Sequence, residues 1–185
     1  MESTDKTNYI HFLVMEYRKL KDEQKSRIEY RDHMTYLMLG AIGAVFSFAI
    51  EKPDYAVALL VLPFICIVLG WTYLMNDEKT SQIDKYIRSE LIPKIRLIVS
   101  ESADSTFQDW EYYHLKIARR KERKWIQLII DLSIFCVSAF FSIAVFFYLS
   151  TGHSITQIVL AVIESLFILY LAYQFISYTS ISVGD

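Results

Sequence analysis

Four long apolar segments constrain what this 185-residue chain can fold into. Residues 34–50 and 55–75 contain no acidic or basic side chain, and residues 126–149 and 156–178 contain one acid each. Each segment is close to the roughly 20 residues that an α-helix needs to cross a ~30 Å hydrocarbon core. The sequence therefore predicts an all-α, polytopic membrane protein with four transmembrane helices. The first segment is the shortest, and a chain of three spans is the alternative.

The order of apolar and charged segments predicts two transmembrane hairpins with long cytoplasmic helical extensions. The expected parts are a cytoplasmic N-terminal helix (1–33), hairpin 1 (34–75), a cytoplasmic helical region (76–125), hairpin 2 (126–178) and a cytoplasmic tail (179–185). Pro53 cannot continue the first helix but can open the second, which favours a tight turn at residues 51–54. More than thirty residues rich in charge precede the first span, which argues against a cleavable signal peptide.

Basic residues set the expected orientation of the spans. Seven of the 19 Lys and Arg residues precede Thr35, one is Lys52, and eleven lie between Asn76 and Trp125. Because Lys and Arg near span ends are retained in the cytoplasm, both termini and the central region are expected inside. The expected location is the cell (inner) membrane, crossed several times. Cys66 and Cys136 both lie in apolar segments and suggest no disulfide framework.

Two cytoplasmic segments have the pattern of amphipathic helices. Residues 8–33 contain no Pro or Gly and are expected to run unbroken into the first span. Residues 81–99 are expected to form a second helix with a kink at Pro93. The apolar faces would comprise Leu13, Tyr17, Leu20 and Ile28 in the first helix and Ile83, Ile87, Leu91, Ile95 and Ile98 in the second. Lys25 and Glu29 illustrate the i,i+4 pairs of opposite charge.

Small residues recur four apart in the first span. Gly40 pairs with Ala44, and Gly43 pairs with Ser47. Small side chains at this spacing let a second helix approach closely in a membrane. We expect the second span to be that neighbour.

A third helix carries a polar stripe. A capping box at Ser105 and Gln108 predicts its start, and no helix breaker follows until Gly152. At 100° per residue, one arc of roughly 80° contains Tyr113, Lys116, Arg120, Lys124, Gln127, Asp131, Ser138 and Ser142. A polar stripe facing lipid would be costly, so it must face protein or water. Either the hydroxyls bond across helices, or the helix lines a pore.

Two acids lie inside spans that contain no Lys, Arg or His to neutralise them. They are Asp131 in the third span and Glu164 near the middle of the fourth. One reading is a protonated Glu164 hydrogen-bonded to a nearby Ser, Tyr or Gln. The other is a ring of Glu164 or Asp131 side chains around the axis of a homo-oligomer, which would favour cations. Gln157 shares the face of Glu164, so the pore-lining candidates are Gln127, Asp131, Ser138, Ser142, Gln157 and Glu164.

A basic cluster immediately precedes the third span. It comprises Lys116, Arg119, Arg120, Lys121, Arg123 and Lys124, with Tyr113 beside it. Such a cluster normally sets topology and binds anionic membrane lipid. Aromatic rings next to Arg and Lys also bind nucleotides or single-stranded nucleic acid. Trp71, Tyr73 and Trp125 are expected to be interfacial anchors.

Enzyme signatures were sought, and the expectation is that the chain is not an enzyme. It has no phosphate-binding Gly-rich loop, no paired His at metal spacing and no Cys–His arrangement. Arg27 and His33 match the loose spacing of HEPN ribonucleases, but Ile28 replaces the polar residue of the stricter pattern. No cofactor or metal is expected.

In size and topology, the chain resembles the small multi-span membrane effectors of bacterial anti-phage defence systems. That resemblance implies a homo-oligomeric pore that depolarises the membrane when a cytoplasmic nucleotide, oligonucleotide or protein activates it. No diagnostic motif carries the resemblance, so no family residue is transferred. The competing hypothesis is a non-conducting scaffold or regulatory subunit that holds a cytoplasmic partner at the membrane. A third hypothesis is a proton-coupled transporter that uses Glu164, but no span shows the Gly or Pro interruption that often marks a midplane substrate site.

Overall fold

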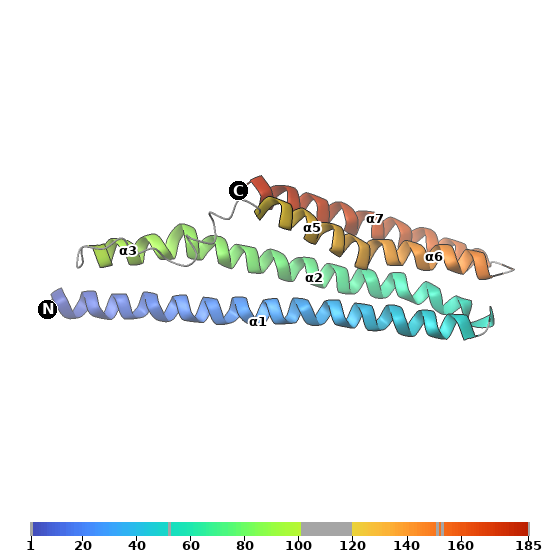
Figure 1. Ribbon diagram of the computed structural model, residues 1–185, viewed down its shortest axis with the longest axis horizontal. Helices are drawn as coiled ribbons and strands as arrows, with labels where there is room; N and C mark the ends of the chain where they lie inside the picture. The colour runs from blue at the N-terminus through green and yellow to red at the C-terminus, as the bar shows by residue number, and fades with distance from the viewer. Residues whose placement is uncertain (1, 52, 101–119, 151, 153, 185) are drawn as a thin grey trace. The chain divides into compact units, whose positions relative to one another are not determined.

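The computed structural model describes residues 2–51, 53–100, 120–150, 152 and 154–184, and all but Ser150, Gly152 and Ser154 of these lie in helices (Figure 1). The helices, three of them short η segments of 3₁₀ or π geometry, are α1 (Glu2–Glu51), η1 (Pro53–Leu60), α2 (Val61–Tyr86), η2 (Ile87–Leu91), α3 (Ile92–Ser100), α5 (Arg120–Leu132), η3 (Ser133–Val137), α6 (Ser138–Leu149) and α7 (Ile155–Gly184). No strand occurs among these residues. The all-α prediction is confirmed for the described part of the chain.

Four helical segments are long and apolar enough to cross a membrane. They are Thr7–Glu51, Tyr55–Ile98, Lys124–Leu149 and Ile155–Ser180. Each contains one of the four apolar segments of the sequence. The chain therefore has four candidate spans, as predicted. The predicted capping box at Ser105 and the predicted helix before Arg120 lie outside the described residues.

The chain divides into two compact units. Unit 1 consists of residues 1–31 and 76–117, and unit 2 consists of residues 32–75 and 118–185. The charged segments of the sequence fall mainly in unit 1 and the apolar segments in unit 2.

Unit 1 is held together by the two apolar faces that the sequence predicts. Leu13, Ile87 and Leu91 are buried in one cluster. Around this cluster pack Tyr17, Leu20, Ile83, Ile92, Ile95 and Ile98. Ile28 was expected on the same face, but its side chain is exposed. Of the predicted i,i+4 pairs, Lys25–Glu29 is present at 3.9 Å.

The second amphipathic helix does not start near Ser81. Instead, α2 runs from Val61 to Tyr86 and continues through η2 into α3. No Pro or Gly separates Trp71 from Pro93, so nothing in the sequence stops the helix. A π-helical turn at Ile87–Leu91 precedes Pro93, and the Ile92 N–H bonds to the Ile87 carbonyl five residues back. This wider turn gives room to the proline ring, which would clash with the carbonyl four residues before it.

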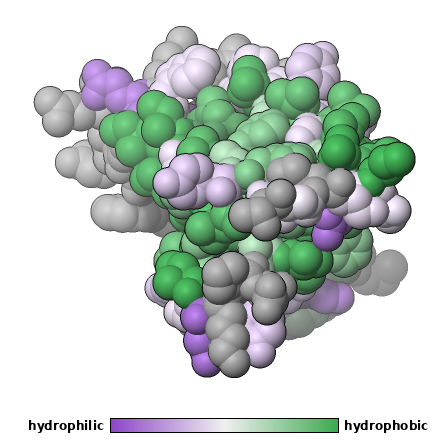
Figure 2. All heavy atoms as spheres, turned by 90° about the vertical axis from the view of Figure 1, so that its right-hand side faces the viewer, coloured by the Kyte–Doolittle hydropathy of each residue, from purple (hydrophilic) through white to green (hydrophobic). Residues whose placement is uncertain are grey.

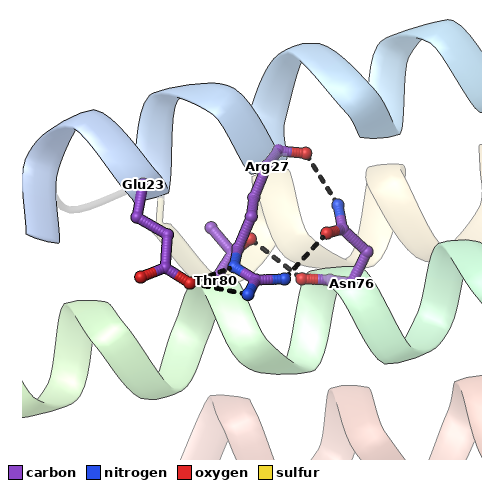
Figure 3. Close-up of polar contacts among 4 residues, drawn as sticks. All are labelled: Glu23, Arg27, Asn76 and Thr80. Atoms are coloured by element: carbon purple, nitrogen blue, oxygen red, sulfur yellow. Dashed lines mark hydrogen bonds and ion pairs between the residues drawn. The ribbon is translucent and has the colours of Figure 1, made fainter.

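A hydrogen-bonded clasp joins α1 to α2 in unit 1 (Figure 3). Asn76 is 7% exposed, and its amide donates to the Arg27 carbonyl at 2.7 Å while its Oδ1 accepts from the Arg27 guanidinium at 3.4 Å. Glu23 Oε1 accepts from Arg27 Nη2 at 2.6 Å, and Thr80 Oγ1 donates to the Asn76 carbonyl at 2.9 Å. Because Asn76 bonds to both the backbone and the side chain of Arg27, it fixes the register of the two helices.

Unit 2 packs its helices around aromatic side chains. η1 contacts α6, and α7 contacts α5, η3 and α6. Tyr73, Phe135 and Phe175 form a three-way contact between α2, η3 and α7, with ring centroids 5.2–6.1 Å apart. Cys66 and Cys136 are buried free thiols in the same core. Large rings therefore fill the space where three helices meet.

The small-residue stripe of the first span does not pack against the second span. A Cβ added to Gly40 or Gly43 would have no neighbour within 4 Å, and Ala44 and Ser47 are exposed. The core side of this part of α1 is instead formed by Met34, Met38 and Ala49. At 100° per residue, the stripe lies roughly 140–240° around the helix from Met38. The prediction was wrong because bulky apolar residues on the opposite side form the core.

The outside of unit 2 is largely apolar. Exposed side chains include Phe64, Phe141, Leu166, Phe167 and Leu169. Figure 2 shows hydrophobic residues over much of the visible face and hydrophilic ones mainly at its margin. An apolar exterior of this extent is typical of a surface that faces lipid.

The glycine at position 70 allows three helices of unit 2 to meet. A Cβ added there would lie 2.7 Å from Leu171 Cδ2 and 3.3 Å from Phe135 Cβ. We expect Gly70→Val to destabilise the fold by about 1–3 kcal/mol, because the added methyl groups overpack this contact. Thermal unfolding in detergent measures the change. Combining it with Leu171→Ala should restore part of the loss, and an unaltered midpoint in the single variant would contradict the close packing.

Candidate functional site

The third-span stripe faces the interior of unit 2. Asp131 is 8% exposed, Ser142 is fully buried, and Gln127 and Ser138 are half-buried. These side chains come from α5 and α6 and point toward helices of the same chain. Lining of a pore by these residues stays a prediction.

Asp131 is hydrogen-bonded to a tyrosine of α2. The Tyr73 hydroxyl donates to Asp131 Oδ1 at 2.9 Å, and Gln127 Nε2 donates to the Tyr73 oxygen at 3.4 Å. Tyr73 is 4% exposed. The structure thus brings together two predicted site residues, Gln127 and Asp131, through a third that the sequence interpretation had assigned to the interface.

Tyr73 could have been found from its position in the sequence. It lies three residues before Asn76 at the end of one apolar segment, and Asp131 lies six residues after Trp125 at the start of another. If both segment ends lie on the same side of a membrane, the two residues lie at similar depth. Trp71 and Trp125, the other predicted anchors, are exposed.

Ser142 on α6 bonds to a backbone carbonyl one helical turn before Pro63. Its hydroxyl donates to the Leu59 carbonyl at 2.5 Å. Residue 63, four positions after Leu59, is proline and has no N–H to give that carbonyl an α-helical hydrogen bond. Where no water is present, a free carbonyl must be satisfied by protein. Ser142 therefore has a structural role in joining α6 to η1.

Ser138 lies beside a π-helical turn. The Ser138 N–H bonds to the Ser133 carbonyl five residues back, and the Ser138 hydroxyl donates to the Ile134 carbonyl. Ser138 Oγ is also 3.7 Å from Cys66 Sγ on α2. Turns of this kind locally widen a helix and occur often at functional sites. Here the serine hydroxyl bonds a carbonyl that the wider turn leaves without its usual partner.

Gln157 caps α7. Its Oε1 accepts a hydrogen bond from the Ser154 N–H at 3.0 Å, and the Ser154 carbonyl accepts from the Gln157 N–H at 3.0 Å. The bond from the Ser154 N–H to the Gln157 side chain is one of the two bonds of a capping box, and the Ser-x-x-Gln pattern could have predicted it. The amide is therefore engaged at the helix end and does not contact Glu164.

Glu164 lies on the packed face of α7, between Ala161 and Ile168. It is 6% exposed. Its Oε2 has no hydrogen-bond partner among the described residues. A buried polar atom without a partner in a native protein calls for an explanation in terms of strain, function or a missing ligand. This carboxyl group is the clearest functional candidate in unit 2.

Most side chains of the basic cluster lie outside the described part of the chain. Tyr113, Lys116 and Arg119 lie outside the described residues, as do the side chains of Arg120, Lys121 and Arg123. Lys124 is half-buried on α5. The predicted anion or lipid site therefore stays a prediction.

Unit 1 contains a cleft that the sequence interpretation missed. Its volume is about 280 Å³, and it is lined by Leu20, Glu23, Arg27, Lys79, Gln82, Ile83 and Tyr86. The Tyr86 hydroxyl donates to Glu16 at 2.9 Å, and this hydrogen bond raises the pKa of the phenol. Arg27 and Lys79 give the cleft two positive charges against the single negative charge of Glu23.

The described residues contain no group of three or more His, Cys, Asp or Glu side chains that could hold a metal ion. Comparison with protein-family models, curated proteins and solved structures finds no match. The geometry of this chain itself therefore points to its function. Its main elements are a partnered acid, Asp131, and an unpartnered one, Glu164, inside helices that can span a membrane.

Ser142→Ala provides a test of the proline compensation. We expect it to lower stability by about 1–2 kcal/mol, because the Leu59 carbonyl loses its donor in a water-free core. Ser133→Ala is the matched control, since the Ser133 hydroxyl is on an exposed position and bonds within its own helix. Both are measured by thermal unfolding in detergent. Equal effects of the two substitutions would contradict a special role for Ser142.

Proposed function

We propose that this protein is an ion-conducting membrane protein that assembles as a homo-oligomeric channel. The observation that carries the proposal is Glu164, a buried carboxyl group with an unpartnered oxygen inside an apolar helix. Acids inside spans are expensive to bury, and they commonly mark ion or proton pathways. Asp131, buried and bound to Tyr73, is the second acid of the pathway.

The proposed topology has four spans in two hairpins with both termini in the cytoplasm. All 19 Lys and Arg residues then lie on the cytoplasmic side or in the 51–54 turn. Residues 1–33 and 76–125 form cytoplasmic helical extensions, and the host membrane is the inner membrane of a bacterial cell. The apolar exterior of unit 2 supports contact with lipid.

The cytoplasmic helices are the proposed entry point for a gating signal. The cleft lined by Arg27 and Lys79 has a net positive charge and suits an anionic group. A nucleotide, an oligonucleotide or an acidic protein segment carries such a group. Opening of the channel in response to this activator would depolarise the membrane, in keeping with a role in anti-phage defence.

Assembly of several copies is supported by the exposed stripe on α1. In an apolar 18-residue window of each candidate span, only 17% of the first and 22% of the fourth are buried within one chain, against 44% of the second. Gly40 and Gly43 have open space above them. Small residues on a lipid-facing helix allow close approach of another helix, here that of a second copy.

A second candidate function is a non-conducting scaffold that recruits a cytoplasmic partner through unit 1. The hydrogen bonds of Asp131, Ser142 and Gln157 favour it, since each explains a polar residue by structure alone. Glu164 is the residue that this alternative leaves unexplained. The proposed absence of enzymatic activity remains a prediction under both.

Ion flux across liposomes separates the two functions. We expect the reconstituted protein to dissipate an ion gradient, and Glu164→Gln or Asp131→Asn to reduce the rate at least about tenfold if the acid lies on the ion path. Glu51→Gln is the matched control, because Glu51 is an exposed acid at the end of α1. An intact gradient with the unsubstituted protein would favour the scaffold. Unchanged flux in both acid variants would assign Asp131 and Glu164 to structural roles.

Oligomerisation through α1 is tested by adding bulk to the stripe. We expect Gly43→Ile to shift the protein toward monomers in detergent and nanodiscs, because a branched side chain prevents close helix approach. Val162→Phe on the exposed side of α7 is the control and should leave the oligomer intact. Mass photometry measures both. A protein that is monomeric before any substitution would exclude the assembly.

A further inference from the structure

The position of Glu164 defines what can reach it. It is the tenth residue of α7, about 14 Å from the helix start at 1.5 Å per residue, and therefore close to mid-membrane. Ala161, Ile168 and Leu171 lie on the same buried face. The carboxyl group is therefore enclosed by apolar side chains and contributes little to the surface of a single chain.

The nearby polar side chains of α6 and α7 already make other hydrogen bonds. The Ser165 hydroxyl donates to the Ala161 carbonyl at 2.7 Å. The Ser142 hydroxyl donates to Leu59, and the Gln157 amide oxygen caps α7. The expected hydrogen bond from a nearby Ser, Tyr or Gln is therefore absent for Oε2 among the described residues.

No cation is available in the spans to neutralise Glu164. The elements packed against α7 are α5, η3 and α6, with further contacts from α2 through Gly70, Trp71 and Tyr73. Their titratable or charged side chains within the spans are Asp131, Cys136, Tyr148, Cys66 and Tyr73, and Glu122 and Lys124 precede the apolar part of α5. Asp131 is bound to Tyr73, both cysteines are buried free thiols, and Tyr148 is 87% exposed. No residue within the apolar segments 55–75, 126–149 and 156–178 is basic.

A charged carboxylate in this position would be very unfavourable, because neither water nor an opposite charge stabilises it. The packed side chain is therefore neutral and carries a proton. A metal cation could replace that proton only with several further oxygen ligands. The described residues contain no group of three acidic, His or Cys side chains.

We propose that Glu164 is a proton-binding site in the interior of unit 2 and that the ion carried by this unit is H⁺. The assignment of H⁺ as the transported ion rests on the proposed conducting function. Binding of a proton at Glu164 does not depend on that function. A proton needs only one oxygen atom to bind and no water-filled passage. The site can therefore bind a proton among the packed helices of each chain. Release of the proton requires water or a rearrangement to reach the carboxylate.

Carbodiimide labelling of the full chain in membranes tests proton binding. Dicyclohexylcarbodiimide partitions into apolar regions and reacts with a protonated carboxyl: the proton moves to one nitrogen, and the carboxylate oxygen bonds to the central carbon. The O-acylisourea then rearranges to a stable N-acylurea, so the complete reagent is added and nothing leaves. Mass spectrometry of the α7 peptide should show this adduct on Glu164 near neutral pH.

Three comparisons make the labelling specific. Glu164→Gln should remove the adduct, and Glu164→Asp should retain it. Asp131 accepts a hydrogen bond from the Tyr73 hydroxyl, so it should react more slowly than Glu164. A water-soluble carbodiimide should instead favour exposed Glu51. An unlabelled Glu164 in the folded, unsubstituted protein would overturn the proposed site without requiring any variant to fold.

Proton and potassium flux in liposomes test the transported ion. We expect a pH-sensitive dye to report proton flux that falls at least about tenfold in Glu164→Gln, whereas Glu164→Asp retains part of it. Potassium flux without proton flux would overturn the assignment of H⁺ while leaving the channel proposal in place. Labelled Glu164 without flux of either ion would overturn conduction while leaving the proton-binding site.

Discussion

The burial of polar groups among packed apolar helices is the constraint on which the rest of the structure depends. Every polar group there must find its partner in the protein. Pro63 has no N–H to give the Leu59 carbonyl an α-helical hydrogen bond, and the Ser142 hydroxyl donates to that carbonyl from another helix. In the same way, the Tyr73 hydroxyl donates a hydrogen bond to Asp131. These bonds connect α2 and η1 to α5 and α6 at two depths and restrict how the helices can slide past one another.

The two buried acids differ in their hydrogen bonding. Asp131 lies in a small polar cluster with Tyr73 and Gln127 and is explained by its hydrogen bonds. Glu164 has an unpartnered oxygen on a face that is otherwise apolar. A leucine would suit this apolar face better, so packing alone does not explain a glutamate at this position.

The sequence predicted the number of spans and the faces of unit 1 because both depend on local periodicity. Long apolar segments and the i,i+4 pattern of Ile83, Ile87 and Leu91 are properties of single helices. The positions of Gly40 and Gly43 relative to other helices were predicted incorrectly. Small residues permit close approach, but the larger buried area of Met34 and Met38 decides which side of α1 faces the core.

The hydrogen-bond partner of Ser142 was beyond sequence reasoning for a related reason. Its role depends on a residue 83 positions away, whose relative depth only the packed structure provides. Gln157 was a different case, because its cap at Ser154 is local and could have been predicted. The engagement of Gln157 at the helix end leaves Glu164 without the amide that shares its helix face.

Helix continuity defines where the proposed gating signal would act. α1 and α2 each belong to both units, and neither helix is interrupted where unit 1 ends, at Arg31 and Asn76. The Arg27–Asn76 clasp lies within about one helical turn of both positions. Under the proposed function, a ligand that disturbs the clasp would therefore act on the register of α1 and α2 within unit 1.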